Sequence, residues 1–172
     1  LPNLDSYRFN TPIANIEEAD LVILCGTNPK IESPIINHKI FKSYNAGTEI
    51  FNIGEDISLN YPTHYLGQTL NDLDNDLLKK HLKKATNPIL IVGSGFLSQF
   101  NSDHTLKALF SFASKSKIIT ANKNNLNFLS PHASRVGQLL LGNTTDDICH
   151  PFTKLKKKSF DTVLSFGSEH IA

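Results

Sequence analysis

Three corners that contain glycine are the residues of this sequence whose types and spacing best suit ligand binding. Each corner follows a short apolar run, and the three are Gly26-Thr27-Asn28-Pro29, Gly93-Ser94-Gly95 and Gly167-Ser168. Ligands of open α/β sheets bind beyond the carboxyl ends of the strands, so turns of this kind are candidates to face a nucleotide. The third glycine of a dinucleotide fingerprint is absent after Gly95, and no G-x-x-x-x-G-K-[ST] phosphate loop occurs. We therefore favour ordinary turn residues and keep a bound nucleotide as the alternative.

The remaining reactive side chains favour neither a metal site nor catalysis. His150 adjoins Cys149, but two neighbouring ligands cannot complete a tetrahedral site, and the seven histidines show no metal-binding spacing. Ser94 directly follows its glycine, whereas a nucleophile elbow needs the serine two residues after the glycine. We interpret the acidic residues from Glu17 to Asp20 as a surface turn, because nothing in the sequence brings two carboxylates together on a substrate. No catalytic residue and no metal ligand are therefore predicted.

Charge and hydropathy argue against nucleic-acid and membrane partners. The 172 residues carry 17 basic and 16 acidic side chains, so the chain has no general attraction to nucleic acid or anionic lipid. We interpret the one dense basic run, Lys154 to Lys158, as a solvated loop. No apolar run approaches the roughly 20 residues of a membrane-spanning helix, so no direct membrane insertion is expected.

The elements that must position the first corner follow from the apolar pattern. The continuous apolar run Leu21 to Cys25 is typical of a strand covered on both faces, as in a parallel sheet. A helix is expected from Pro34, with Ser33 as its N-cap and Gly47 at its end, followed by a strand from Glu49 to Ile53. Its apolar stripe comprises Ile36, Ile40 and Tyr44, with Phe41 beside them. These elements form one right-handed strand–helix–strand unit.

Segments on either side of this unit complete the first half. Residues 1–17 are expected to be an extended lead-in segment, with Ile13 and Ile16 packed at the sheet edge. Residues 54–67 are predicted to be a loop. The spacing of the leucines then predicts one amphipathic helix from Leu70 to Leu82.

The second half repeats the pattern around the second and third corners. A strand is predicted from Ile89 to Val92 and a helix from Ser102 or Asp103, followed by a strand over residues 117–120. The predicted buried residues of this helix are Leu106, Leu109, Phe110 and Ala113. We expect one more helical stretch between residues 122 and 141, broken at Pro131, then a loop over 142–158 and a third strand that ends at Gly167.

The predicted fold is α/β, built from parallel-sheet strand–helix–strand lobes. Residues 1–86 are expected to form the first lobe, with its lead-in segment and connecting helix. Residues 87–172 form the second lobe, which runs into a third unit that the chain does not complete. We therefore expect the fold to be incomplete in this chain.

The run from Ile13 to Tyr44 closely resembles a known family. It is similar to the carboxyl-terminal region of the large iron–sulfur subunit of NADH:ubiquinone oxidoreductase, or respiratory complex I, a region related to molybdopterin oxidoreductases. The most specific element is ADLVILCGTNP, which is followed by Glu32, Pro34, Asn37, Lys39 and Ile40. The likeness continues through Leu66-Gly67 and the strand from Pro88 to Ser94, and more loosely from Phe160 to Gly167.

This resemblance implies a segment of the hydrophilic arm of an assembly that passes electrons from NADH to quinone. The family's iron–sulfur clusters lie in amino-terminal domains, so no cofactor is expected in this chain. In the related molybdenum enzymes, the loop that matches Gly26, Thr27, Asn28 and Pro29 helps to hold a pterin guanine dinucleotide. In complex I the resemblance implies a retained fold whose cofactor is lost, so these four residues are candidates for a vestigial loop.

Three functions remain open at this point. The first is a non-catalytic scaffold domain that packs against other subunits of complex I, especially the cluster-bearing part of the same subunit. The second is a fragment of an active molybdopterin-dependent oxidoreductase, and the third is a nucleotide-binding module. The family implies the matrix side of the mitochondrial inner membrane, or the cytoplasmic side of a bacterial membrane.

Overall fold

The computed structural model describes residues 4–97, 102–130, 132, 135–140 and 162. The chain divides into two compact units, residues 1–133 and 134–172. The first unit contains the sheet, and the second contributes one described helix, α6 (Arg135–Leu140). Among the helices of these described ranges, none combines the length and hydropathy that a membrane crossing requires.

A parallel five-stranded sheet forms the centre of the first unit, in the order β3-β2-β1-β4-β7. Its strands are β1 (Leu21–Cys25), β2 (Glu49–Ile53), β3 (His64–Gly67), β4 (Pro88–Val92) and β7 (Leu126–Phe128). The central strand β1 pairs with β2 and β4, and Ile23 lies opposite Phe51 on one side and Leu90 on the other. The predicted α/β fold with a parallel sheet is confirmed.

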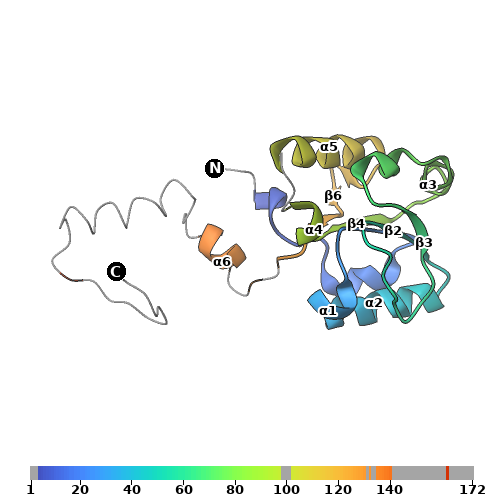
Figure 1. Ribbon diagram of the computed structural model, residues 1–172, viewed down its shortest axis with the longest axis horizontal. Helices are drawn as coiled ribbons and strands as arrows, with labels where there is room; N and C mark the ends of the chain where they lie inside the picture. The colour runs from blue at the N-terminus through green and yellow to red at the C-terminus, as the bar shows by residue number, and fades with distance from the viewer. Residues whose placement is uncertain (1–3, 98–101, 131, 133–134, 141–161, 163–172) are drawn as a thin grey trace. The chain divides into compact units, whose positions relative to one another are not determined.

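Helices cover both faces of this sheet (Figure 1). The helices α3 (Asp76–Leu82) and α5 (Ser102–Lys115) lie on one face, and α2 (Pro34–Asn45) lies on the other. Because side chains alternate along a strand, Ile23 packs in the core with α3 and α5, whereas Leu24 packs in the core with α2. All five residues of β1 are buried, which explains its uninterrupted apolar sequence.

Successive strands of the chain are added first on one side of β1 and then on its other side. From β1 it proceeds to β2 and β3 on one side, and it then returns to β4 on the other side. The helices α1 (Pro29–Glu32) and α2 follow β1, whereas α4 (Ser94–Leu97) and α5 follow β4 onto the opposite face. Such a switch point leaves a crevice at the carboxyl ends of the two strands. The strands β1 and β4, which belong to different predicted lobes, pair directly here. The predicted boundary between the two lobes, at residues 86 and 87, stays a prediction.

The first strand–helix–strand unit agrees with its prediction. Helix α2 begins at Pro34, and Ser33 holds the N-cap position, although its side chain makes no capping hydrogen bond. The helix ends at Asn45, and Gly47 adopts the left-handed region with φ of 102°. Ile36 and Ile40 are buried as expected.

The prediction of a loop over residues 54–67 is wrong at its end, because His64–Gly67 form the edge strand β3. His64 pairs with Phe51 and Tyr65 pairs with Asn52, with an irregular register before Gly67. His64 and Tyr65 are exposed, so this strand lacks the apolar pattern that marks the central strands. Backbone pairing at the sheet edge, rather than burial, forms it.

The predicted single helix from Leu70 to Leu82 is also wrong, because two helices occupy that range. A 3₁₀ helix, η3 (Leu70–Asp74), precedes α3, and Asn75 between them has an extended backbone. The Asn75 side chain accepts a hydrogen bond from the N–H of Leu77 at 2.9 Å. An N-cap therefore restarts the helix in the middle of the leucine pattern.

The strand predicted over residues 117–120 does not belong to the main sheet. Ile119–Thr120 form β5, which pairs antiparallel with β6 (Lys123–Asn124) in a separate two-stranded sheet. The fifth strand of the main sheet is β7, so the predicted helical stretch over 122–141 is wrong through residue 128, and α6 lies within its last part. Leu109 and Ala113 of α5 are buried as predicted, but Leu106 and Phe110 are only partly buried.

Buried side-chain amides explain why the sequence did not predict the strand β7. Asn127 is 0% exposed, and its Oδ1 accepts a hydrogen bond from the N–H of Thr11 at 2.7 Å. Its Nδ2 donates to the Thr11 hydroxyl at 2.9 Å and to the Asn125 carbonyl at 2.9 Å. These bonds compensate for burying the amide, so a polar residue lies within a core strand.

The lead-in segment is not extended as predicted. It contains two 3₁₀ helices, η1 (Leu4–Ser6) and η2 (Ile13–Glu18). Ile16 is fully buried as expected, but Ile13 is 46% exposed, so its predicted packing is wrong.

Asp20 connects the beginnings of the two central strands. Its carboxylate accepts hydrogen bonds from the Thr86 N–H at 2.5 Å, the Thr86 hydroxyl at 2.8 Å and the Asn87 N–H at 2.9 Å. Partial burial raises the pKa of Asp20, but these hydrogen bonds outweigh that effect and hold the pKa below its usual value.

Replacing this carboxylate should therefore cost stability in a pH-dependent way. We expect Asp20→Asn to lower the free energy of unfolding by about 1 kcal/mol at pH 7, because an amide offers one acceptor fewer to the three donors. The lowered pKa stabilises the fold above the unfolded-state pKa of about 3.9 and is lost as the pH falls through the folded-state value. Urea unfolding at pH 7 and pH 3 should show a smaller difference between variant and parent at pH 3. Asp56→Asn, at an exposed carboxylate, serves as the control, and an Asp20→Asn effect that is equal at both pH values contradicts the assignment.

Candidate functional site

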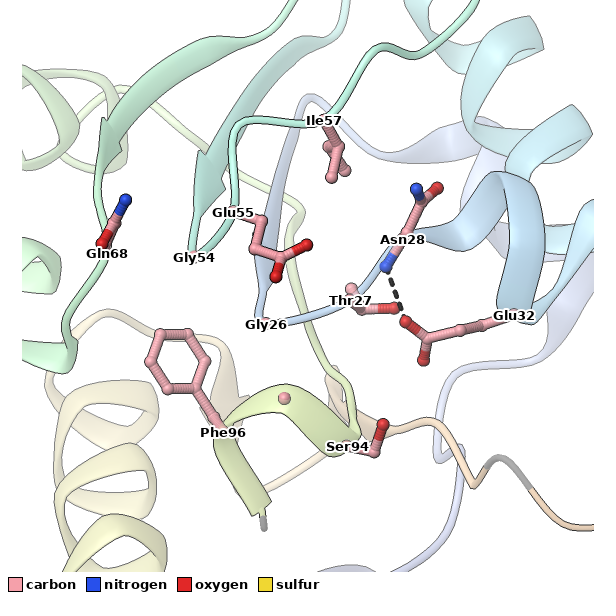
Figure 2. A pocket seen from close by; sticks show the side chains of 11 residues that line it. Gly26, Thr27, Asn28, Glu32, Gly54, Glu55, Ile57, Gln68, Ser94 and Phe96 are labelled. Atoms are coloured by element: carbon pink, nitrogen blue, oxygen red, sulfur yellow. Dashed lines mark hydrogen bonds between the residues drawn. The ribbon is translucent and has the colours of Figure 1, made fainter. Parts of the chain in front are cut away.

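A pocket of about 480 Å³ lies at the switch point, where the strands β1, β2 and β4 end (Figure 2). Its walls come from the turn after β1, the turn after β2 and the start of α4. The described lining residues are Gly26, Thr27, Asn28, Glu32, Gly54, Glu55, Ile57, Gln68, Ser94, Gly95 and Phe96. Three of the four predicted loop residues thus line this pocket, whereas Pro29 is buried at the start of α1 and is not among the lining residues.

Two of the three predicted corners meet beside the pocket. The N–H of Gly95 donates to the Gly26 carbonyl at 3.0 Å, and the N–H of Gly93 donates to the Cys25 carbonyl at 2.9 Å. The N–H of Gly26 donates to the Ile53 carbonyl at 2.8 Å. Backbone groups of neighbouring strands therefore use these three glycine amides. The third corner, Gly167-Ser168, lies outside the described residues.

Close packing between the two corners excludes side chains from them. A Cβ on Gly93 would lie 2.5 Å from the Thr27 Cβ and 2.6 Å from the Gly26 carbonyl oxygen. A Cβ on Gly95 would lie 2.7 Å from the same oxygen, and Gly26 itself has φ of 57°. The three glycines are thus required by contacts within the protein, whether or not a ligand binds.

Sequence reasoning did not single out the turn after β2. Gly54 directly follows the apolar run of β2, as Gly26 follows that of β1, so the same rule could have found it. A Cβ on Gly54 would lie 3.1 Å from the Gly26 Cα. Glu55 comes next and lines the pocket, but an isolated glutamate after a strand gives no signal in the sequence.

Carboxylates and unpartnered oxygens dominate the polar surface of the pocket. The N–H of Asn28 donates to Glu32 Oε1 at 2.6 Å, as Figure 2 shows. Among the described residues, three buried side-chain oxygens have no hydrogen-bond partner: Thr27 Oγ1, Asn28 Oδ1 and Glu32 Oε2. Glu32 and Glu55 are the charged members of the described lining, so its formal charge is negative.

This set of groups does not fit the pyrophosphate of a pterin guanine dinucleotide. A pyrophosphate needs backbone N–H donors or cationic side chains, preferably at a helix N-terminus. The Asn28 N–H here is bonded to a carboxylate, the Gly95 N–H is bonded to a carbonyl, and the described lining contains no basic residue. The carboxylates of Glu32 and Glu55 would also repel the phosphates.

Other residues considered from the sequence do not assemble a reactive site. Glu17 accepts a hydrogen bond from Lys39 Nζ at 2.6 Å, which lowers the pKa of Glu17, whereas Asp20 faces Thr86. The acidic turn therefore directs its carboxylates to different partners. Burial raises the pKa of the Cys25 thiol.

No group of three His, Cys, Asp or Glu side chains within the described ranges could hold a metal ion. Ser94 lines the pocket at the start of α4. Cys149, His150 and the basic run Lys154 to Lys158 lie outside the described residues.

Known proteins similar to this chain are named as subunits of NADH-ubiquinone or NADH-quinone oxidoreductases. The chain is 33% identical over 144 residues to the NADH-ubiquinone oxidoreductase 75 kDa subunit of Reclinomonas americana. The matched stretch covers 80% of this chain and 21% of that protein. It is 34% identical over 145 residues to the mitochondrial 78 kDa subunit of Candida albicans, with coverage of 81% and 20%. It is 34% identical over 146 residues to an NADH-quinone oxidoreductase subunit of Rickettsia bellii, with coverage of 81% and 21%.

These relatives confirm the resemblance inferred from the run Ile13 to Tyr44. The chain spans about one fifth of the length of each of them. The family model of the molybdopterin oxidoreductases matches residues 2–172. Since this match covers nearly the whole sequence, the chain belongs to the molybdopterin oxidoreductase family.

Proposed function

We propose that this chain is a non-catalytic scaffold segment of the large peripheral-arm subunit of respiratory complex I. In that role it supports electron transfer from NADH to ubiquinone by the assembly and carries no reacting group itself. The observation that favours this role is the corner beside the pocket, where protein acceptors already bond to two backbone N–H groups of the lining. The central contacts are Gly95 N–H to Gly26 O and Asn28 N–H to Glu32 Oε1.

The glycines of the corner are compatible with this loss of a cofactor. Each is required by the close approach of the β1 and β4 turns, so a chain that no longer binds a dinucleotide still needs Gly26, Gly93 and Gly95 in order to fold. A glycine-rich corner therefore supports a scaffold as well as a nucleotide-binding module. The carboxylates of Glu32 and Glu55 favour the scaffold.

The proposed partners are the other subunits of complex I, in particular the cluster-bearing part of the same subunit. A potato relative, 32% identical over 150 residues, is named NADH dehydrogenase [ubiquinone] iron-sulfur protein 1. This sequence contains two cysteines, and one of them, Cys25, is buried in β1. It therefore cannot by itself hold an iron–sulfur cluster that needs four cysteine ligands. We propose that the clusters lie in other parts of the assembly. The proposed location is the matrix side of the mitochondrial inner membrane, with the cytoplasmic side of a bacterial membrane as the alternative.

The structural requirement for the glycine corner can be tested by adding one methyl group. We expect Gly93→Ala to lower the free energy of unfolding by about 1–3 kcal/mol, because the Cβ would collide with backbone atoms that cannot move independently. The matched control is Gly137→Ala, whose Cβ meets nothing within 4 Å. Urea unfolding of both variants measures the difference, and a Gly93→Ala variant as stable as the control would remove the packing explanation.

The lost nucleotide site can be tested with guanosine diphosphate. Calorimetric titration into the whole chain should show no saturable binding tighter than a Kd of about 1 mM, because the pocket opposes a pyrophosphate with two carboxylates. Micromolar binding that weakens in Asn28→Ala would instead support a nucleotide-binding module.

Assignment to a respiratory assembly can be tested on the complex purified from its source. Native mass spectrometry should find this polypeptide among many subunits, and elemental analysis should find iron without stoichiometric molybdenum. If the chain occurred alone or in a small complex with stoichiometric molybdenum, the scaffold role would be wrong and a fragment of an active molybdopterin enzyme would replace it.

A further inference from the structure

The switch-point pocket contains buried oxygens that favour a hydrogen-bond donor. Thr27 is 6% exposed, and its hydroxyl oxygen, which can accept a hydrogen bond, has no partner in the part of the chain that the structure describes. Glu32 Oε2 is also buried and has no partner among these described residues, although Oε1 of the same carboxylate accepts from Asn28 N–H at 2.6 Å. A buried carboxylate oxygen can only accept, and leaving it unpaired costs free energy. An occupant that supplies N–H groups would remove that cost.

A second carboxylate, that of Glu55, belongs to a turn that two side chains hold in place. Asn52 is buried, and its Nδ2 donates to the Glu55 carbonyl at 2.7 Å. The Tyr65 hydroxyl donates to the Gly54 carbonyl at 3.2 Å. Figure 2 shows the Glu55 and Glu32 carboxylates on either side of Thr27, from different walls of the pocket. The two negative charges therefore come from different walls of the pocket, and hydrogen bonds from Asn52 and Tyr65 hold the turn that contains Glu55.

We propose that this pocket binds a cationic hydrogen-bond donor, namely a guanidinium or alkylammonium group. Such a group pairs with carboxylates through charge-assisted hydrogen bonds, and a guanidinium can bond to more than one oxygen at once. Two sources carry this chemistry: an Arg or Lys side chain of an adjacent polypeptide, and a free polyamine. The proposal rests on the proposed function, because the cation would take the place at the carboxyl ends of the strands where open α/β folds bind a nucleotide.

A nuclear magnetic resonance titration of the ¹⁵N-labelled whole chain tests the proposal. The probes are N-acetyl-argininamide, which represents an Arg side chain in a polypeptide, and spermidine, which represents a free polyamine. We expect saturable shifts of the Gly26, Asn28 and Gly95 amide signals with at least one of them. Glu32→Gln and Glu55→Gln should each weaken that binding about tenfold, because each removes one charged acceptor.

Glu18→Gln is the matched control, since Glu18 is an exposed glutamate before β1, at the end of the strand opposite the pocket. It should change the affinity less than twofold, although it removes the same charge. Because Glu55 is exposed, Glu55→Gln keeps the test valid if Glu32→Gln fails to fold.

The possible outcomes separate this proposal from the scaffold role. Tighter binding of N-acetyl-argininamide supports a polypeptide side chain, and tighter binding of spermidine supports a free polyamine. Absence of saturable shifts with both probes, or equal weakening by Glu18→Gln, overturns the cation site and leaves the scaffold role in place. Guanosine diphosphate shifting the same amides tightly would overturn both.

Discussion

The close approach of the turns after β1 and β4 is the constraint on which the rest of this structure depends. The two strands are in register up to Cys25 and Val92, so the next residues, Gly26 and Gly93, must pass each other. The Gly26 carbonyl accepts the Gly95 N–H, and no Cβ fits at Gly93 or Gly95. Because the chain leaves the two strands toward opposite faces, this junction fixes where α1 and α4 begin and leaves a pocket beside it.

The chemistry of that pocket follows from how the junction uses its donors. In an open α/β fold, free N–H groups at this edge would favour an anion. Here backbone carbonyls accept from Gly93 and Gly95, and the Glu32 carboxylate accepts from Asn28. The pocket therefore presents hydrogen-bond acceptors and negative charge at the carboxyl ends of the strands, where open α/β folds commonly bind phosphates. The glycine turns are thus present beside a pocket whose described charged residues are carboxylates.

Local sequence predicted the three central strands and the amphipathic helix between the first two of them along the chain. The strands β1, β2 and β4 and the helix α2 have apolar residues at the period of their own structure, so each is recognisable without its neighbours. The edge strand β3 and the strand β7 lack that signal. β3 is exposed and depends on pairing with β2. β7 contains Asn127, whose amide is satisfied by Thr11, a residue far away in sequence. Because part of the hydrogen bonding of Asn127 comes from this distant residue, no local pattern could reveal the strand.

The candidate site likewise combines features that local sequence predicts with features that depend on tertiary contacts. The sequence by itself determined that Gly26 to Pro29 and Gly93 to Gly95 are turns at the ends of buried strands, and that the chain resembles its family, because turn residues and apolar runs are local properties. Only the tertiary structure decided that these two turns pack against each other and that Gly54 and Glu55 join them. Strand order and register bring these groups together across long sequence distances. The sign of the charge in the pocket is thus a property of the assembled sheet and not of any one motif.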